Sequence, residues 1–274
     1  MKNQRTVAAV GILVVALLAT SVALPMVATG APANQVSVTD MPEAGDALAD
    51  PADGTWEDAE STEVPLASAP SGLPNAGSVA TDAVDVEAVR TESTLYVRMT
   101  WDDDTMNAST NDTTAFADAA AMQIPANETS NPDIALGSQD TPVNVWYWNA
   151  AEGTEEIVAG GQGTITEVDQ PAIESQAVHE DGTWTVVMER SLSADAENRA
   201  ALDTETDVDV AFAVWDGANG ERSGHHAVSE WFTYPFGPAD TGPAIQYLFW
   251  AIAGIAIAIA LVVTVMAIRR TRQP

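Results

Sequence analysis

The chain has 274 residues, no cysteine and a formal net charge of −30 at pH 7, with 40 acidic residues against 10 basic ones. Without cysteine it cannot form disulfides, thiolate zinc sites or cysteine-ligated iron–sulfur clusters, and without a basic patch it is not expected to bind nucleic acid. Because so large an unbalanced charge destabilises a compact fold unless concentrated salt screens it, the composition favours a halophilic host over a cation-binding device.

The N-terminal residues have the pattern of a secretory signal. Lys2 and Arg5 precede an apolar run over residues 7–24, and small residues around Ala31 offer a cleavage site. We therefore expect residues 1–33 to be a signal peptide. The alternative is an uncleaved anchor, because the apolar run is marginally long enough to span a membrane.

A second apolar run covers residues 244–268 and would be about 38 Å long as a helix, which is enough to span a bilayer. Aromatic residues mark its start, and arginines follow its end from Arg269. Because positive residues stay on the cytoplasmic side, the sequence predicts a transmembrane helix over residues 241–268 and a cytoplasmic tail over residues 269–274. Residues 34–240 would then form a domain on the outer face of the cell membrane.

The sequence between these two ends predicts a domain made of β-strands. Residues 34–75 are rich in Pro, Ala, Asp and Gly and predict an extended lead-in segment. After them, apolar runs or period-two alternations of strand length are separated by turns. These predicted strands cover residues 84–89, 95–101, 116–124, 143–148, 173–178, 184–188 and 208–215. Asp181-Gly182 is a tight-turn signal between two of them. Many strands at short spacing, without a βαβ pattern, predict an all-β fold, namely an antiparallel β-sandwich.

A polar loop over residues 102–115 follows the second predicted strand. It begins with Asp102, Asp103 and Asp104 and contains two glycosylation sequons, which are typical of a surface loop in an exported protein. The three aspartates could bind calcium, but in so acidic a chain a solvated loop is the expected state.

The three histidines are the residues best suited to chemistry. His179 lies next to the predicted Asp181 turn and is expected in an exposed loop. His225 and His226 follow a glycine-rich turn and precede a strand, where neighbouring side chains point to opposite faces, so only one of them can face inward. The sequence has no nucleophilic serine elbow and no His-Glu-x-x-His run. Catalysis by this chain alone is therefore the least expected function.

An inward histidine at the end of a β-sandwich can bind a metal ion or a haem iron, and methionine with histidine is a common pair of haem ligands. Met99, Met122 and Met188 lie in apolar strands and are candidate partners. For each methionine the alternative is ordinary core packing. Trp146 and Trp148 share one face of a strand, where they would pack in the core or against a haem.

Four segments, taken in order, resemble a known family: residues 95–103, 116–125, 142–150 and 213–231. They are similar to the haem-b-binding gamma subunits of ethylbenzene dehydrogenase and of related dehydrogenases and reductases. The resemblance implies a β-sandwich that holds one haem b between its sheets, with methionine and lysine as axial ligands.

The resemblance places the lysine position at His226, and the mature domain contains no lysine. We therefore expect His226 and Met122 to be the iron ligands, with Met99 as the second choice of methionine. Trp146 and Trp148 are expected to contact the haem.

The resemblance also implies an electron-transfer role. The haem would relay single electrons between an iron–sulfur subunit and a membrane cytochrome or soluble electron carrier, and a separate molybdopterin subunit would carry the substrate chemistry. The C-terminal helix departs from these relatives, whose gamma subunits are generally soluble, and would tether the complex to the membrane. The alternatives are a haem-free module that binds carbohydrate or protein and a structural surface protein.

Overall fold

The computed structural model describes residues 34–70, 77–109, 114–126, 137–161, 164–193, 199–202 and 206–236. All of them fall in one compact unit, Pro32–Pro238. Within these residues no helix is long and apolar enough to cross a bilayer. The predicted signal peptide, residues 1–33, and the predicted membrane helix, residues 241–268, lie outside the described residues.

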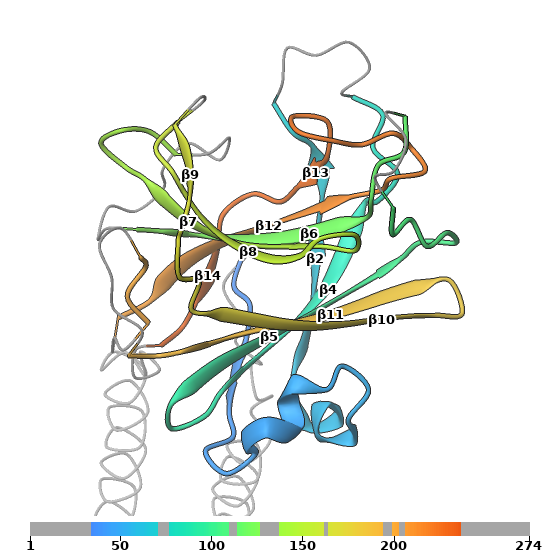
Figure 1. Cartoon of the computed structure of the whole chain (residues 1–274). Helices are drawn as coiled ribbons and strands as arrows, with labels where there is room; N and C mark the ends of the chain where they lie inside the picture. The colour runs from blue at the N-terminus through green and yellow to red at the C-terminus, as the bar shows by residue number, and fades with distance from the viewer. Residues whose placement is uncertain are drawn as a thin grey trace, which may run out of the picture. The chain divides into compact units, whose positions relative to one another are not determined.

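The fold consists of two β-sheets (Figure 1). The smaller sheet has the strand order β1-β4-β5-β11-β10, with β2 also paired to β4. Its strands are β1 (Val38–Asp40), β2 (Ser61–Pro65), β4 (Ala83–Arg90), β5 (Thr94–Asp102), β10 (Ile173–Glu180) and β11 (Thr183–Ser191).

The larger sheet has the order β3-β13-β12-β6-β7-β8-β9, with β14 also paired to β12. Its strands are β3 (Ala67–Ser68), β6 (Ala119–Pro125), β7 (Val143–Asn149), β8 (Gly153–Ala159), β9 (Ile165–Glu167), β12 (Val208–Trp215), β13 (Ala227–Val228) and β14 (Phe232–Tyr234). Among these strands β1 and β4 pair in parallel and all other pairs are antiparallel. The predicted antiparallel all-β fold is confirmed.

The β10–β11 hairpin forms where the sequence predicts it. Asp181 and Gly182 have φ values of 51° and 81°, and positive φ at both central residues is the requirement of a two-residue type I′ turn. The prediction of an exposed loop at His179 is wrong, because this residue pairs with Trp184 inside the hairpin. The His179 side chain is half-buried, with Nε2 2.8 Å from the carbonyl oxygen of Asp103 and its ring 4.9 Å from that of Trp184.

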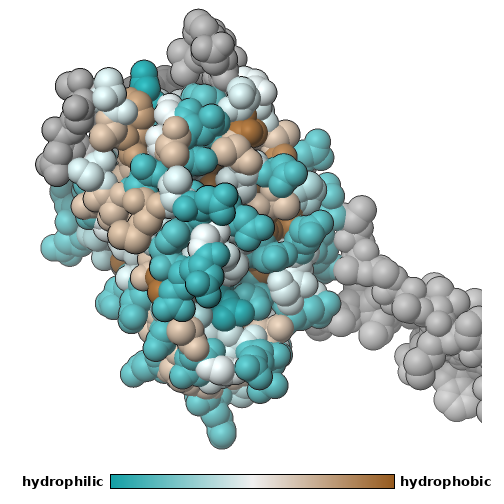
Figure 2. Space-filling view, turned by 90° about the vertical axis from the view of Figure 1, so that its right-hand side faces the viewer, coloured by the Kyte–Doolittle hydropathy of each residue, from teal (hydrophilic) through white to brown (hydrophobic). Residues whose placement is uncertain are grey.

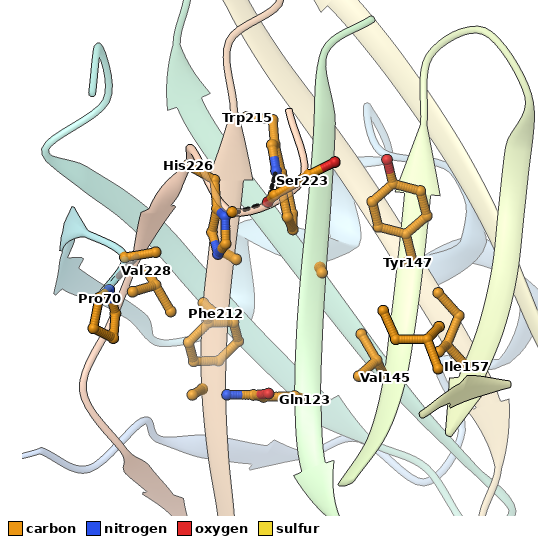
Figure 3. A pocket seen from close by; sticks show the side chains of 16 residues that line it. Pro70, Gln123, Val145, Tyr147, Ile157, Phe212, Trp215, Ser223, His226 and Val228 are labelled. Carbon is orange, nitrogen blue, oxygen red and sulfur yellow. Dashed lines mark hydrogen bonds between the residues drawn. The ribbon is translucent and has the colours of Figure 1, made fainter. Parts of the chain in front are cut away.

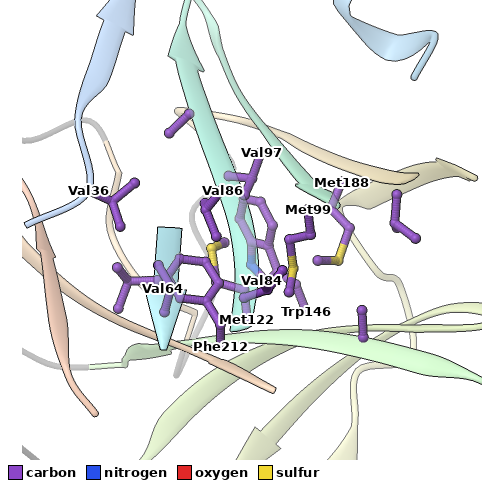
Figure 4. Close-up of a cluster of buried hydrophobic side chains, with 14 of the residues drawn as sticks. Val36, Val64, Val84, Val86, Val97, Met99, Met122, Trp146, Met188 and Phe212 are labelled. Carbon is purple, nitrogen blue, oxygen red and sulfur yellow. The ribbon is translucent and has the colours of Figure 1, made fainter. Parts of the chain in front are cut away.

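The main core lies between the inner faces of the two sheets. Strand β6 shows the alternation, since Ala120, Met122 and Ile124 belong to this core while Ala121 and Gln123 point to the other face. Large side chains from both sheets fill the space between them (Figure 4), and those without exposed surface include Val86, Val97, Met99, Met122, Trp146, Met188 and Phe212. Hydrogen bonds between the sheets, such as that from Arg190 Nη1 to Asn144 Oδ1 at 2.9 Å, add to this packing.

Two short 3-10 helices cover the outer face of the smaller sheet. They are η1 (Gly45–Ala49) and η2 (Gly54–Asp58). Leu48 and Trp56 from these helices pack on the strand residues Val89, Tyr96 and Val187. The prediction of an extended lead-in over residues 34–75 is thus wrong, because the described part of this segment contains both helices and the strands β1, β2 and β3.

The surface carries the acidic character of the sequence. The face seen in Figure 2 is mostly hydrophilic, with apolar residues scattered between the polar ones. A net charge far from zero, −30 for this chain, favours solubility.

Candidate functional site

The outer face of the larger sheet is apolar, as its inner face is. Outward side chains of β6, β7, β8, β12 and β13 form a second cluster, whose buried members are Ala121, Val143, Val145, Ala159, Ala213 and Val228. An antiparallel sheet commonly keeps one face polar and solvated, so an apolar outer face points to a binding site. This face is therefore the candidate functional surface of the domain.

A cavity of about 420 Å³ lies on this surface. Small side chains of the central strands β6 and β12 leave its space open, namely Ala121, Ala211 and Ala213. Larger side chains surround them, with Tyr147 and Ile157 on one side and Pro70, His226 and Val228 on the other (Figure 3). Trp215 lies on β12 itself, with its ring 5.6 Å from that of Tyr147. The pattern of small residues at the centre and large ones at the flanks makes a groove on the sheet without opening the core.

His226 stands at the edge of this cavity in a fixed orientation. Its ring stacks on the Trp215 indole at 4.4 Å between centroids and an interplanar angle of 27°. Its Nδ1 lies 2.8 Å from the carbonyl oxygen of Ser223, which also accepts the indole N–H of Trp215 at 3.2 Å. Because a carbonyl can only accept a hydrogen bond, Nδ1 carries the proton and Nε2 carries the free lone pair.

The environment of His226 also keeps its imidazole neutral. Burial lowers the pKa of His226 to about 4, although the hydrogen bond to Ser223 acts in the opposite direction. At neutral pH the ring is therefore uncharged, and Nε2 points away from Ser223 in Figure 3. A neutral imidazole whose other nitrogen donates to a backbone carbonyl is the usual form of a metal-ligating histidine.

The neighbouring histidine is placed differently. Nε2 of His225 lies 3.2 Å from the carbonyl oxygen of Ser78, and His225 does not line the cavity. Only one histidine of the pair faces the groove, as the alternation argument predicts.

The other predicted haem contacts lie on the opposite face of the sheet from His226. Met122, Trp146 and Trp148 belong to the core between the sheets, where the first two are fully buried and Trp148 is 6% exposed. Met122 Sδ accepts a hydrogen bond from the buried Tyr234 hydroxyl at 3.3 Å. In this structure Met122 and His226 lie on opposite faces of the larger sheet and point away from each other.

The expected haem position between the sheets therefore does not coincide with the cavity. Met99, the second choice of methionine, is also fully buried in the inner core. No methionine or lysine is among the described residues that line the cavity. Burial of Trp146 and Trp148 also removes the exposed tryptophan platform that a carbohydrate-binding module would offer.

Several residues of the site were not singled out in the sequence. Trp215 and the Ser223 carbonyl hold the His226 ring, and alanines make the floor of the groove. The period-two recurrence of Ala211 and Ala213 in β12 is the one sequence signal that could have indicated a groove, because small residues at alternate positions leave space on one face.

The apolar groove with a neutral histidine at its rim offers the features that a haem requires. Haem requires an apolar slot and an axial ligand, and the described residues supply both. His226 Nε2 is the nitrogen that would face the iron, while Trp215 and the apolar flanks would contact the macrocycle.

Comparison with known proteins gives consistent matches along the chain. The profile of the ethylbenzene dehydrogenase family matches residues 53–170 and 162–227. The chain is 44% identical over 270 residues to a putative respiratory nitrate reductase heme subunit, ORF7, of Haloferax mediterranei, and the match covers 98% of each chain. It is 36% identical over 195 residues to the chlorate reductase subunit gamma of Ideonella dechloratans, covering 70% of this chain and 82% of that one. It is 31% identical over 252 residues to the dimethylsulfide dehydrogenase subunit gamma of Rhodovulum sulfidophilum, covering 84% and 94%.

Proposed function

Because the chain belongs to the ethylbenzene dehydrogenase family of gamma haem subunits, we propose that it binds one haem b in the groove of the larger sheet and serves as an electron-transfer subunit. The observation that carries this assignment is His226. It is a neutral imidazole at the rim of an apolar cavity, and its proton is committed to the Ser223 carbonyl.

The residues around the groove have distinct tasks in this function. His226 would supply a nitrogen ligand to the iron, and the stacked Trp215 indole together with the Ser223 carbonyl would keep that nitrogen oriented. Apolar side chains of the groove, such as Val145 and Ile157, would exclude water from the cofactor. When bound, the haem would supply one-electron redox chemistry, with a potential tuned by burial and by the hydrogen bond between His226 and Ser223.

The electrons pass between subunits of a larger complex. Relatives of this chain carry the names of subunits of nitrate reductase, chlorate reductase and dimethylsulfide dehydrogenase. The partners are accordingly an iron–sulfur subunit and a molybdopterin subunit, with a membrane cytochrome or a soluble carrier as the further electron partner. The substrate chemistry belongs to the molybdopterin subunit and not to this chain.

The domain lies outside the cytoplasm and is held at the cell membrane by its C-terminal segment. The apolar runs over residues 7–24 and 244–268 support this location, as do the arginines that begin at Arg269. The acidic composition supports a high-salt environment.

The experiment that tests the haem assignment replaces His226 with alanine in the full-length chain. Haem content and the reduced optical spectrum are measured, and His225→Ala is the matched control because it removes the adjacent imidazole that faces Ser78. We expect about one haem per chain in the wild type and in the control, and loss of the bound haem spectrum in His226→Ala with the circular dichroism of the β-sheets retained. An unchanged haem content and spectrum in His226→Ala would refute the ligand assignment, and a colourless but folded wild type would refute haem binding itself.

A further inference from the structure

Three aspartates from distant segments meet near the end of β12. Asp103 lies just after β5, Asp118 just before β6 and Asp216 just after β12. One carboxylate oxygen from each lies within 4.8 Å of the other two. Asp118 is fully buried, Asp103 is 8% exposed and Asp216 is half-buried. Buried like charges at such distances repel each other strongly unless a positive charge stands between them.

Three N–H donors bind the carboxyl group of Asp118. Its Oδ1 accepts the backbone N–H of Gly217 at 2.9 Å. Its Oδ2 accepts the N–H of Asn107 at 2.7 Å and the indole N–H of Trp184 at 3.0 Å. Burial, together with the nearby Asp103 carboxylate, raises the pKa of Asp118, and these three donors oppose that shift without cancelling it. A carboxylate offers about four acceptor positions, so one position on Oδ1 stays open to a cation.

Asp103 supplies an independent sign of a missing ligand. Its Oδ1 accepts the N–H and the hydroxyl of Thr105, both at 2.9 Å. Its Oδ2 is buried and has no hydrogen-bond partner among the described residues, an arrangement that is costly for a carboxylate. The ion pairs formed between described residues include none of the three aspartates. The group that would satisfy this oxygen and offset the three charges is therefore a cation.

We propose that Asp103, Asp118 and Asp216 bind one divalent cation of the calcium type. All three donors are carboxylate oxygens, which suits a hard cation and not zinc. Calcium accepts irregular sets of oxygen ligands, whereas magnesium requires nearly ideal octahedral geometry. The sequence predicts a solvated loop for the three consecutive aspartates. In the structure the middle one, Asp103, is buried, while Asp102 and Asp104 remain exposed.

The cation would join three segments that the sheets leave separate, and one of them carries His226. Asp216 begins the turn that ends ten residues later at His226. The next residue, Gly217, lies against the β6 side of the site, because a Cβ at Gly217 would be 2.0 Å from the carbonyl oxygen of Phe116. Binding of the cation therefore fastens the base of the His226 turn to the segment that leads into β6. The effect on haem rests on the proposed function, whereas the cation site does not.

The test uses the full-length chain, first stripped with a chelator and then titrated with Tb³⁺ or Ca²⁺ at constant salt concentration. Trp184 donates to Asp118, so excitation of tryptophan should sensitise emission from Tb³⁺ at this site. We expect saturable emission from about one Tb³⁺ per chain that Ca²⁺ displaces, and a rise in Tm with Ca²⁺. Asp103→Asn and Asp216→Asn should each weaken Ca²⁺ binding at least tenfold.

Asp104→Asn is the matched control, because it removes one charge from the adjacent exposed residue. It should bind Tb³⁺ and Ca²⁺ as the wild type does. Equal responses in all variants would mean diffuse binding to the acidic surface and would overturn the site, as would the absence of saturable emission from the wild type. Asp216→Asn keeps the test decisive if Asp103→Asn does not fold, because Asp216 is only half-buried. None of these readouts depends on haem, so failure of the cation site and failure of the haem assignment remain distinguishable.

Discussion

Replacing Met122 with leucine distinguishes a haem ligand from a core residue. Met122 is fully buried between the sheets, and its Sδ accepts the Tyr234 hydroxyl at 3.3 Å. Leucine has a similar volume but cannot accept a hydrogen bond or ligate iron. The substitution therefore keeps the packing nearly constant and removes the sulfur alone.

The expected cost follows from these two contacts. A volume-conserving change in a core costs less than about 1.5 kcal/mol, and a buried hydroxyl left without its partner costs about 1–3 kcal/mol. Sulfur is a weak acceptor, so the Tyr234 contribution should lie near the lower limit. We therefore expect Met122→Leu to lower the free energy of unfolding, measured in denaturant, by about 2 kcal/mol. In a Tyr234→Phe background no hydroxyl is stranded, and the cost of Met122→Leu should fall by about 1 kcal/mol.

The assay is denaturant unfolding of the haem-free chain for Met122→Leu, Tyr234→Phe and the double variant, at one salt concentration. Haem content and the reduced spectrum are measured on the same proteins. Since His226 and Met122 lie on opposite faces of the sheet, we expect the bound haem spectrum to be retained in all three. Loss of that spectrum in Met122→Leu, with no coupling to Tyr234, would show that Met122 is a ligand and that the inner core opens to receive the haem.

Two further predictions concern the His226 proton and the C-terminal segment. Burial lowers the pKa of His226 in the folded protein to about 4, from an ordinary value of 6.5. The neutral ring therefore stabilises the fold fully above pH 6.5, and this stabilisation is lost as the pH falls toward 4. Unfolding of the haem-free protein at about pH 7 and about pH 5 should therefore show a smaller pH effect in His226→Ala than in the wild type, and equal pH effects would contradict a buried neutral ring. A chain that ends at residue 240 should appear in the soluble extracytoplasmic fraction while the full-length chain stays with the membrane, and a soluble full-length chain would exclude the anchor.

Local patterns in the sequence were sufficient for most of the fold. Alternation predicted β4, β5, β10, β11 and β12, and Asp181-Gly182 predicted the turn between two of them. Strand β8 was not predicted, because Glu155 and Glu156 interrupt its apolar pattern. Glu156 is nevertheless fully buried, where Arg199 donates to both of its carboxylate oxygens at 2.7 and 2.9 Å. A partner 43 residues away in the sequence leaves no local signal.

The site was only partly predictable for a related reason. Resemblance to a family identified His226, but it could not decide which face of the larger sheet holds the ligand. Both faces of β6 carry apolar side chains, since Ala120 and Met122 point inward while Ala121 points into the groove beside Gln123. When both faces of a strand carry apolar side chains, the alternation of apolar and polar residues no longer distinguishes the core from a cavity. For this reason the sequence indicates Met122 as a ligand, although its neighbour Ala121 is the residue that faces the groove.

Side-chain volume, and not polarity, separates the two faces of the larger sheet. The inner face carries Trp146, Met122 and Phe212, which fill the sandwich, whereas the centre of the outer face carries alanines such as Ala121 and Ala213, which leave a cavity. Since close packing of the inner face supplies most of the folding free energy, the groove can be empty or filled with little change in the core. The sandwich should therefore fold before its cofactor arrives, and variants of the groove should lose haem without losing the sheets.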